Sequence, residues 1–72
     1  MSDREIRSPS VGSVTEILVQ AGSTVTEGQE LLMIEVMKML IPVVTGVSGK
    51  VSAIMVTPGQ MVQEGDVLMV LE

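Results

Sequence analysis

The sequence contains no histidine and no cysteine. Zinc sites built on these ligands, Ser–His and Cys–His nucleophilic catalysis, haem ligation through either residue, and disulfides are therefore excluded. The sequence also lacks phenylalanine, tyrosine and tryptophan, and its four basic residues face nine acidic ones, for a net charge of −5. Nucleic acid is not an expected partner, because phosphates need a basic surface and unpaired bases stack on aromatic side chains.

Long hydrophobic runs are also missing. Even runs such as Leu31–Ile34 and Val67–Leu71 fall far short of the ~20 apolar residues that a helix needs to span a membrane. The first five residues, MSDRE, lack the apolar core of a secretory signal peptide. We therefore expect a cytoplasmic protein without a membrane partner. We also expect a single domain over residues 1–72, in which residues 1–4 form a short N-terminal extension.

The residues that are present favour strands. Hydrophobic residues make up 46% of the chain, mostly Val, Leu, Ile and Met, while seven Gly and three Pro interrupt them at short intervals. β-Branched residues between frequent turns are typical of strands, and no stretch repeats apolar residues at the i, i+3, i+4, i+7 spacing of a helix. The sequence therefore predicts an all-β protein.

An internal repeat organises the chain. When the sequence is shifted by 37 residues, positions 12–35 align without gaps on positions 49–72, with 10 identities in 24 positions. The identical pairs are Gly12/Gly49, Val14/Val51, Ile17/Ile54, Val19/Val56, Gly22/Gly59, Val25/Val62, Glu27/Glu64, Gly28/Gly65, Leu31/Leu68 and Glu35/Glu72. One supersecondary unit used twice predicts a pseudosymmetric sandwich or closed barrel, in which each half covers the apolar face of the other.

Each unit is expected to contain four short strands. They cover residues 5–8, 13–19, a short stretch around Val25, and 30–35, then 39–44, 50–56, a short stretch around Val62, and 67–71. Turns are expected at Gly22, Gly28, Gly59 and Gly65, because glycine accepts a positive φ. In strand 13–19, Val14 and Leu18 share one face and Ile17 and Val19 the other. Either both faces are partly buried or a β-bulge shifts the alternation.

The junction between the repeats breaks the local pattern. A strand ends near Glu35 and another begins by Met39, so Val36-Met37-Lys38 must reverse the chain, without the glycine that the other turns contain. On composition alone, a solvated lysine among core methionines is the simpler interpretation. However, the chain has only two lysines, and Lys38 has no counterpart in the repeat. Such violations of local rules tend to mark functional sites.

The same five residues carry a family resemblance. Glu35-Val36-Met37-Lys38-Met39 closely resembles the attachment motif of biotinyl/lipoyl carrier domains, which is usually Glu-Ala-Met-Lys-Met in the biotinyl branch. Residues 8–14 (SPSVGSV) resemble the opening strand of that family, and residues 25–31 and 62–68 resemble its paired V-x-x-G-x-x-L signature. The resemblance covers residues 5–72 and places the motif at the junction of the two-fold repeat.

The resemblance implies a fold and a modification site. The family fold is a flattened β-barrel of two four-stranded antiparallel sheets, a barrel-sandwich hybrid with the modified lysine at the tip of the hairpin that joins the halves. Lys38 would carry covalent biotin, with Glu35, Val36, Met37 and Met39 contributing to recognition by the ligase and other partners. The lipoyl branch usually has Asp before the lysine and Ala after it, whereas both neighbours here are Met. Residues 20–24 leave no room for the extra "thumb" loop that some biotinyl domains carry.

The implied function is that of a biotin carboxyl carrier. A biotin–protein ligase would attach biotin, a biotin carboxylase would carboxylate it with ATP and bicarbonate, and a carboxyltransferase would receive the carboxyl group, as in acetyl-CoA carboxylase in fatty acid biosynthesis. The chain would be a non-catalytic carrier subunit or domain, since it offers no nucleophile–base pair and no metal-ligand cluster. The start at Met1, three to four residues before the first expected strand, suggests a free-standing subunit. The acceptor substrate, among acetyl-CoA, propionyl-CoA, pyruvate and urea, stays open.

Two other functions stay open at this point. A lipoyl carrier, or an attachment protein that accepts either group, would use the same lysine. An unmodified β-domain that binds partners through a sheet edge would carry no prosthetic group at all.

Overall fold

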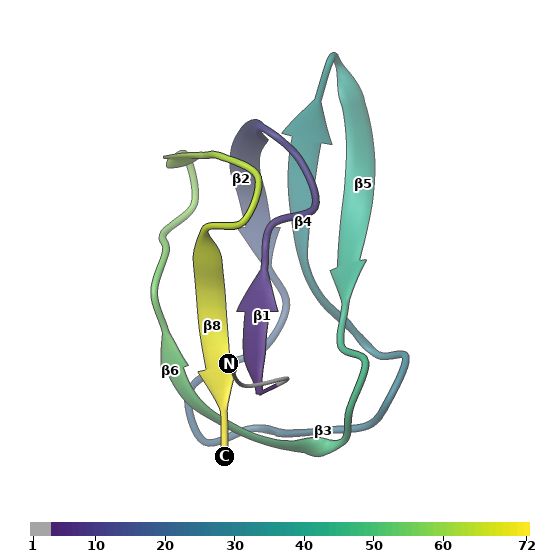
Figure 1. Cartoon of the computed structure of the whole chain (residues 1–72), viewed down its shortest axis with the longest axis vertical. Coiled ribbons are helices and arrows are strands. Elements are labelled where there is room, and N and C mark those ends of the chain that lie inside the picture. Colours follow the sequence, from purple (N-terminus) through teal and green to yellow (C-terminus); the bar gives the residue numbers. More distant parts are fainter. Residues whose placement is uncertain (1–3) are drawn as a thin grey trace.

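The computed structural model of the chain describes residues 4–72 and is all-β over that range. Its eight strands are β1 (Glu5–Arg7), β2 (Gly12–Ile17), β3 (Thr24–Val25), β4 (Glu30–Val36), β5 (Met39–Val44), β6 (Gly49–Ile54), β7 (Met61–Val62) and β8 (Val67–Leu71). They form two four-stranded antiparallel sheets with the strand orders β1-β8-β6-β3 and β5-β4-β2-β7 (Figure 1). The predicted fold class and strand number are confirmed.

The internal repeat appears as a pseudo-two-fold axis. Exchanging β1 with β5, β2 with β6, β3 with β7 and β4 with β8 converts one strand order into the other. The symmetry extends beyond the aligned 24 residues, because the buried hydroxyl residues Ser8 and Thr45 are also 37 positions apart. The Ser8 N–H donates to the Asp66 carbonyl, and the Thr45 N–H makes the equivalent bond to the Gln29 carbonyl.

The core lies between the sheets and obeys the same symmetry. Six pairs of buried residues, each related by the 37-residue shift, form it together with Val56. The pairs are Ile6/Val43, Val14/Val51, Val25/Val62, Leu31/Leu68, Leu32/Met69 and Ile34/Leu71. Each half therefore contributes equivalent side chains, and neither sheet could bury its apolar face without the other.

A β-bulge settles the ambiguous alternation in β2. Val14 pairs with Ile34 and Glu16 pairs with Met33, which leaves Thr15 as the extra residue. Strand β6 has the same irregularity at Ser52, between the Val51 and Ala53 pairings with β8. The extra residues carry hydroxyls that donate to carbonyls of the neighbouring strand, Thr15 Oγ1 to Met33 O and Ser52 Oγ to Val70 O, both at 3.2 Å.

The turn glycines have the positive φ angles that were predicted, while several strands end at other residues than predicted. The four turn glycines have φ values of 95° (Gly22), 89° (Gly28), 91° (Gly59) and 90° (Gly65). The predicted strands 13–19 and 50–56 end at Ile17 and Ile54, because the chain then crosses to the other sheet to form β3 or β7. Strand β1 ends one residue earlier than predicted, at Arg7.

The described part of the chain begins at Arg4. Of the expected extension 1–4, residues 1–3 lie outside the described residues, while Arg4 donates from Nη1 to the Ser48 carbonyl at 2.8 Å. Residues 4–72 contain no helix with the length and apolarity needed to cross a membrane.

Candidate functional site: the β4–β5 hairpin

The hairpin between β4 and β5 projects from one end of the molecule. Figure 1 shows its tip beyond the other elements, with the C-terminus at the opposite end. The last pair of the ladder is Val36 and Met39, so the reversal takes only Met37 and Lys38. The prediction that Val36 belongs to the turn was wrong, since Val36 is the final residue of β4. A two-residue loop is the shortest common hairpin connection, and it leaves the two turn residues at the tip.

Both turn residues have left-handed backbone conformations. The φ values are 51° at Met37 and 67° at Lys38, the signs that a type I′ turn requires. Side chains other than glycine or asparagine pay about 1–2 kcal/mol per residue for this region. Pairing along β4 and β5, from Glu30–Val44 to Val36–Met39, supports the strained turn. An Asn-Gly pair would form this turn with less backbone strain. The less stable pair Met37-Lys38 therefore indicates that these two side chains have a role other than forming the turn.

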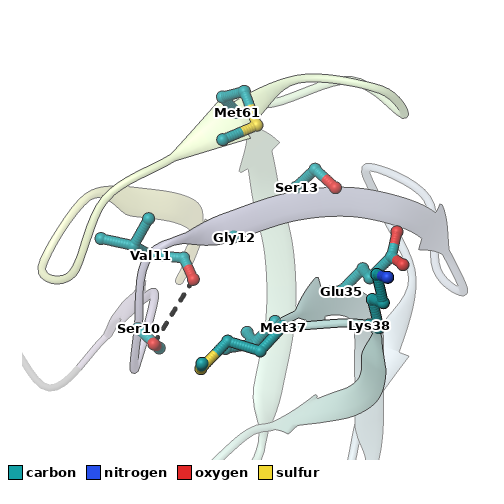
Figure 2. Close-up of a pocket in the computed structure, with 9 residues that line it drawn as sticks. Ser10, Val11, Gly12, Ser13, Glu35, Met37, Lys38 and Met61 are labelled. Atoms are coloured by element: carbon teal, nitrogen blue, oxygen red, sulfur yellow. Dashed lines mark hydrogen bonds between the residues drawn. The ribbon is translucent and has the colours of Figure 1, made fainter.

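The Lys38 side chain is accessible and uncommitted. It is exposed, and within the described range of the chain its ammonium makes neither a hydrogen bond nor an ion pair. Its neighbours Met37 and Met39 are 91% and 65% exposed, so two large apolar side chains flank the amine in solvent. Figure 2 shows the Lys38 amine and the Glu35 carboxylate projecting on the same side of the hairpin.

Glu35 and Val36 differ in what they offer to a partner. Glu35 is exposed and pairs with Ser13 of β2 on one side and Leu40 of β5 on the other. Val36 is half-buried and packs against the core. Of the motif residues expected to take part in recognition, Glu35, Met37 and Met39 are therefore available at the surface, whereas Val36 mainly anchors the hairpin.

A close backbone approach fixes the base of the hairpin. A Cβ atom on Gly12 would lie 2.5 Å from the Glu35 carbonyl oxygen and 3.0 Å from Val36 Cγ2. Only glycine fits there without displacing the end of β4. The repeat places a glycine at the equivalent Gly49, whose Cβ would lie 2.7 Å from the Arg4 guanidinium and 3.0 Å from the Glu72 carbonyl oxygen.

A shallow groove of about 380 Å³ runs beside Lys38 (Figure 2). Its lining joins the turn to two segments distant in sequence: Ser10, Val11, Gly12, Ser13, Glu35, Val36, Met37, Lys38 and Met61. Val11 and Met61 were not predicted as site residues. The available signal was a mismatch between the repeats, since Val11 corresponds to Ser48 and Met61 to Thr24.

Across residues 4–72 no group of three or more acidic side chains is placed to hold a metal ion.

Comparison with known proteins places this geometry in a family. Residues 4–71 match the sequence family described as "Biotin-requiring enzyme". The "Biotinylated protein TB7.3 homolog" of Mycobacterium leprae is 40% identical over 67 residues, covering 93% of this chain and 94% of that protein. The "Biotin carboxyl carrier protein" of Streptococcus mutans is 44% identical over 63 residues, 88% of this chain and 48% of that protein.

Two further similarities widen the comparison. The "Biotin/lipoyl attachment protein" of Bacillus subtilis is 42% identical over 60 residues, covering 83% of this chain and 82% of that protein. The crystal structure of the Kluyveromyces lactis urea carboxylase superposes with a TM-score of 0.89 at 31% identity, covering 94% of this chain and 6% of that one. The chain thus spans nearly all of some relatives and a small part of others. It belongs to the biotin/lipoyl attachment family of the biotin-requiring enzymes.

Proposed function

We propose that this chain is a biotin carboxyl carrier and that Lys38 is its attachment residue. The observation that carries the proposal is the strained two-residue turn, which displays an uncommitted lysine between two exposed methionines at the end of the molecule. The family supports biotin as the group. The chain itself is the carrier portion, and the catalytic domains of carboxylases are not part of it.

The chemistry of attachment suits the site. Lys38 Nζ would form an amide with the carboxyl carbon of biotin that a ligase has activated as its adenylate; AMP leaves and the amine loses its proton in the ligase site. An exposed tip can enter such a site, whereas a lysine within a strand cannot. When bound, biotin supplies the ureido nitrogen that carries the carboxyl group. The protein supplies display and recognition, and the tether raises the effective concentration of biotin at each partner's site.

The partners follow from the carrier role. We propose a biotin–protein ligase for loading, a biotin carboxylase for carboxylation and a carboxyltransferase for delivery, all approaching the hairpin. Met37 and Met39 support this, because exposed methionine side chains give adaptable apolar contacts to more than one partner. Acetyl-CoA carboxylase is one candidate assembly. Relatives named for propionyl-CoA carboxylase and urea carboxylase make other acceptors equal candidates.

A lipoyl group on the same lysine is the second candidate. It is favoured by the similarity to the Bacillus subtilis "Biotin/lipoyl attachment protein". The residues on both sides of Lys38 favour biotin, since the motif resembles the biotinyl rather than the lipoyl form.

The experiment that tests the proposal is intact-mass analysis after co-expression with a biotin–protein ligase and free biotin. We expect the mass of one biotin on the wild-type chain, none on Lys38→Arg, and one on the matched control Lys50→Arg, which removes the other lysine. A biotin mass that is still present on the Lys38→Arg variant would contradict Lys38 as the attachment residue. The mass of a lipoyl group after expression with a lipoyl ligase, without any biotin gain, would support the second candidate. No adduct in either expression would favour an unmodified interaction domain.

A further inference from the structure

The two ends of the pseudosymmetric fold differ in polarity. At the Lys38 end, Val11 and Met61 are 57% and 68% exposed and line the groove beside the lysine. At the other end, the equivalent positions hold Ser48 and Thr24, both exposed and polar. The fold therefore accepts polar residues at these positions. The apolar pair is not required for folding and needs another explanation.

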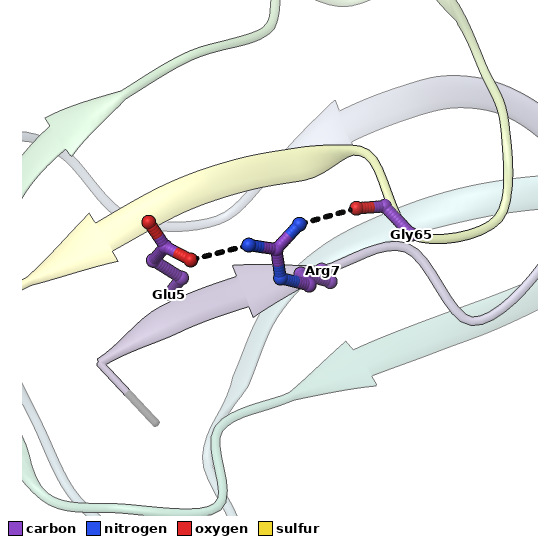
Figure 3. A network of polar contacts seen from close by, with 3 residues as sticks. All are labelled: Glu5, Arg7 and Gly65. Atoms are coloured by element: carbon purple, nitrogen blue, oxygen red, sulfur yellow. Dashed lines mark hydrogen bonds and ion pairs between the residues drawn. The ribbon is translucent and has the colours of Figure 1, made fainter. Parts of the chain in front are cut away.

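The edge strands β1 and β5, which the repeat makes equivalent, show the same contrast in polarity. Edge strand β1 carries Glu5 and Arg7, which form an ion pair, and Arg7 Nη1 also donates to the Gly65 carbonyl at 2.8 Å (Figure 3). Charged side chains and prolines both protect an exposed edge from unwanted pairing, so β1 and β5 differ in polarity rather than in protection. The equivalent edge strand β5 carries Pro42 and Val44 at those positions, and Val44 is 48% exposed. Exposed apolar side chains are thus also present on edge strand β5 of the sheet that presents Lys38.

We propose that the groove formed by Val11, Met37 and Met61 is a docking site for the biotinyl group attached to Lys38. In this docked state the arm lies folded against its own domain between visits to partner enzymes. The inference rests on the proposed function and adds a resting position for the prosthetic group. The occupant is covalently tied to a residue that itself lines the groove, so no separate ligand has to be recruited.

The lining matches the two sides of the biotinyl group. Its valeryl chain and thioether ring are apolar, and the exposed side chains of Val11, Met37 and Met61 provide apolar contact, including sulfur atoms of high polarisability. The ureido edge has N–H donors and a carbonyl acceptor. The hydroxyl of Ser13 and the carboxylate of Glu35 also line the groove, and within residues 4–72 neither side chain is committed to a hydrogen bond.

Tethering makes a weak site effective. A group held on a short flexible arm experiences an effective concentration in the millimolar range. A groove too shallow to bind free biotin can therefore still hold the attached group for much of the time. The fraction of arms that extend into solvent would then set how readily a partner captures biotin.

The direct test is an isotope-filtered NOESY experiment on protein labelled with ¹³C at its methionine methyls and carrying unlabelled biotin. Loading is first confirmed by intact mass, which tests the proposed function separately. We expect NOEs from biotin protons to the Met61 methyl. We expect none to the methyl of Met55, which is 57% exposed, follows β6 of the opposite sheet and does not line the groove. Free biotin added to the unloaded chain at equal concentration should give none.

The second readout is the rate at which streptavidin captures the loaded protein. Met61→Thr and Val11→Ser copy the residues found at the equivalent positions, so both variants should fold. We expect each to be captured about threefold faster than wild type, because only the undocked fraction can bind streptavidin. The matched control Met55→Thr should leave the rate unchanged.

The outcomes separate the two proposals. A loaded protein without biotin–Met61 NOEs, or equal NOEs to Met55 and Met61, would overturn the docking site and leave the carrier function intact. Equal capture rates for wild type and both groove variants would overturn it as well. Absence of loading would instead contradict the proposed function on which the docking site depends.

Discussion

At the scale of single residues, the turn at Met37 and Lys38 trades stability for display. Both residues have positive φ, a conformation in which glycine is at no disadvantage. Met37 is 91% exposed, so its side chain contributes little burial in the isolated domain. The methionine is thus unfavourable for folding and available for contact, as expected of a residue retained for recognition.

Replacing Met37 by glycine tests this trade directly. We expect Met37→Gly to raise the free energy of unfolding by about 0.5–1 kcal/mol, since relief of backbone strain exceeds the entropy cost of glycine. Loading by the ligase should become about tenfold slower, the loss of ~1.4 kcal/mol of contact. Urea denaturation and a timed intact-mass assay measure the two effects. Met55→Gly is the control, because Met55 has no positive φ and should lose stability instead. Unchanged loading of Met37→Gly would argue against a recognition role.

At the scale of elements, the hairpin depends on the strand beside it. Strand β2 approaches β4 so closely at Gly12 that the space for a Cβ is occupied by the Glu35 carbonyl oxygen. The last residue of β4, Val36, is held between this contact and the core. The hairpin tip is therefore positioned by a segment more than twenty residues earlier in the chain.

Alanine at Gly12 is expected to destabilise the domain by about 2–4 kcal/mol, because backbone at the end of a paired strand has to move. The equivalent substitution Gly49→Ala should cost less than half of that. There the 2.7 Å neighbour is Arg4 Nη1, at the end of a long side chain that can shift while the strands stay in place, and the Glu72 carbonyl oxygen is 3.0 Å away rather than 2.5 Å. Thermal and urea unfolding of both variants provide the comparison. Equal losses would show that the approach of β2 to β4 is not special to the hairpin end.

At the scale of the whole molecule, the domain is held together by paired halves. Leu31 and Leu68 are equivalent and both are completely buried between the sheets. Truncating either to alanine removes the same methine and methyl groups from a symmetric core, at a cost of about 2–5 kcal/mol. A domain of this size has about 4–11 kcal/mol of stability in total, so either loss is severe.

We expect Leu31→Ala and Leu68→Ala to lower the free energy of unfolding by amounts that agree within about 1 kcal/mol. Equilibrium urea denaturation of the unloaded protein at low temperature measures both. Neither leucine lines the groove or the turn, so the folded fraction of each variant should still accept biotin on Lys38. A loss twice as large in one variant as in the other would show that the two halves are energetically unequal despite their common geometry.

The sequence by itself determined the all-β class, the two-fold repeat, the glycine turns and the exceptional character of Lys38. These features could be predicted because each depends on local chemistry: apolar β-branched runs, glycine where φ is positive, and a spacing that recurs after 37 residues. The resemblance of residues 35–39 to an attachment motif then connected the lysine to biotin. The match of residues 4–71 to the family model confirmed the predicted family.

Only the tertiary structure decided the bulges at Thr15 and Ser52, the burial of Val36 and the groove beside Lys38. The bulges are properties of register between strands, which a single strand's alternation left ambiguous. Val36 turned out half-buried because β4 continues one residue past its predicted end. The groove could not be predicted from the sequence because Val11, Met37 and Met61 line one surface only when β2, β7 and the hairpin are packed together. Contacts between distant segments depend on the fold as a whole, and local sequence does not specify them.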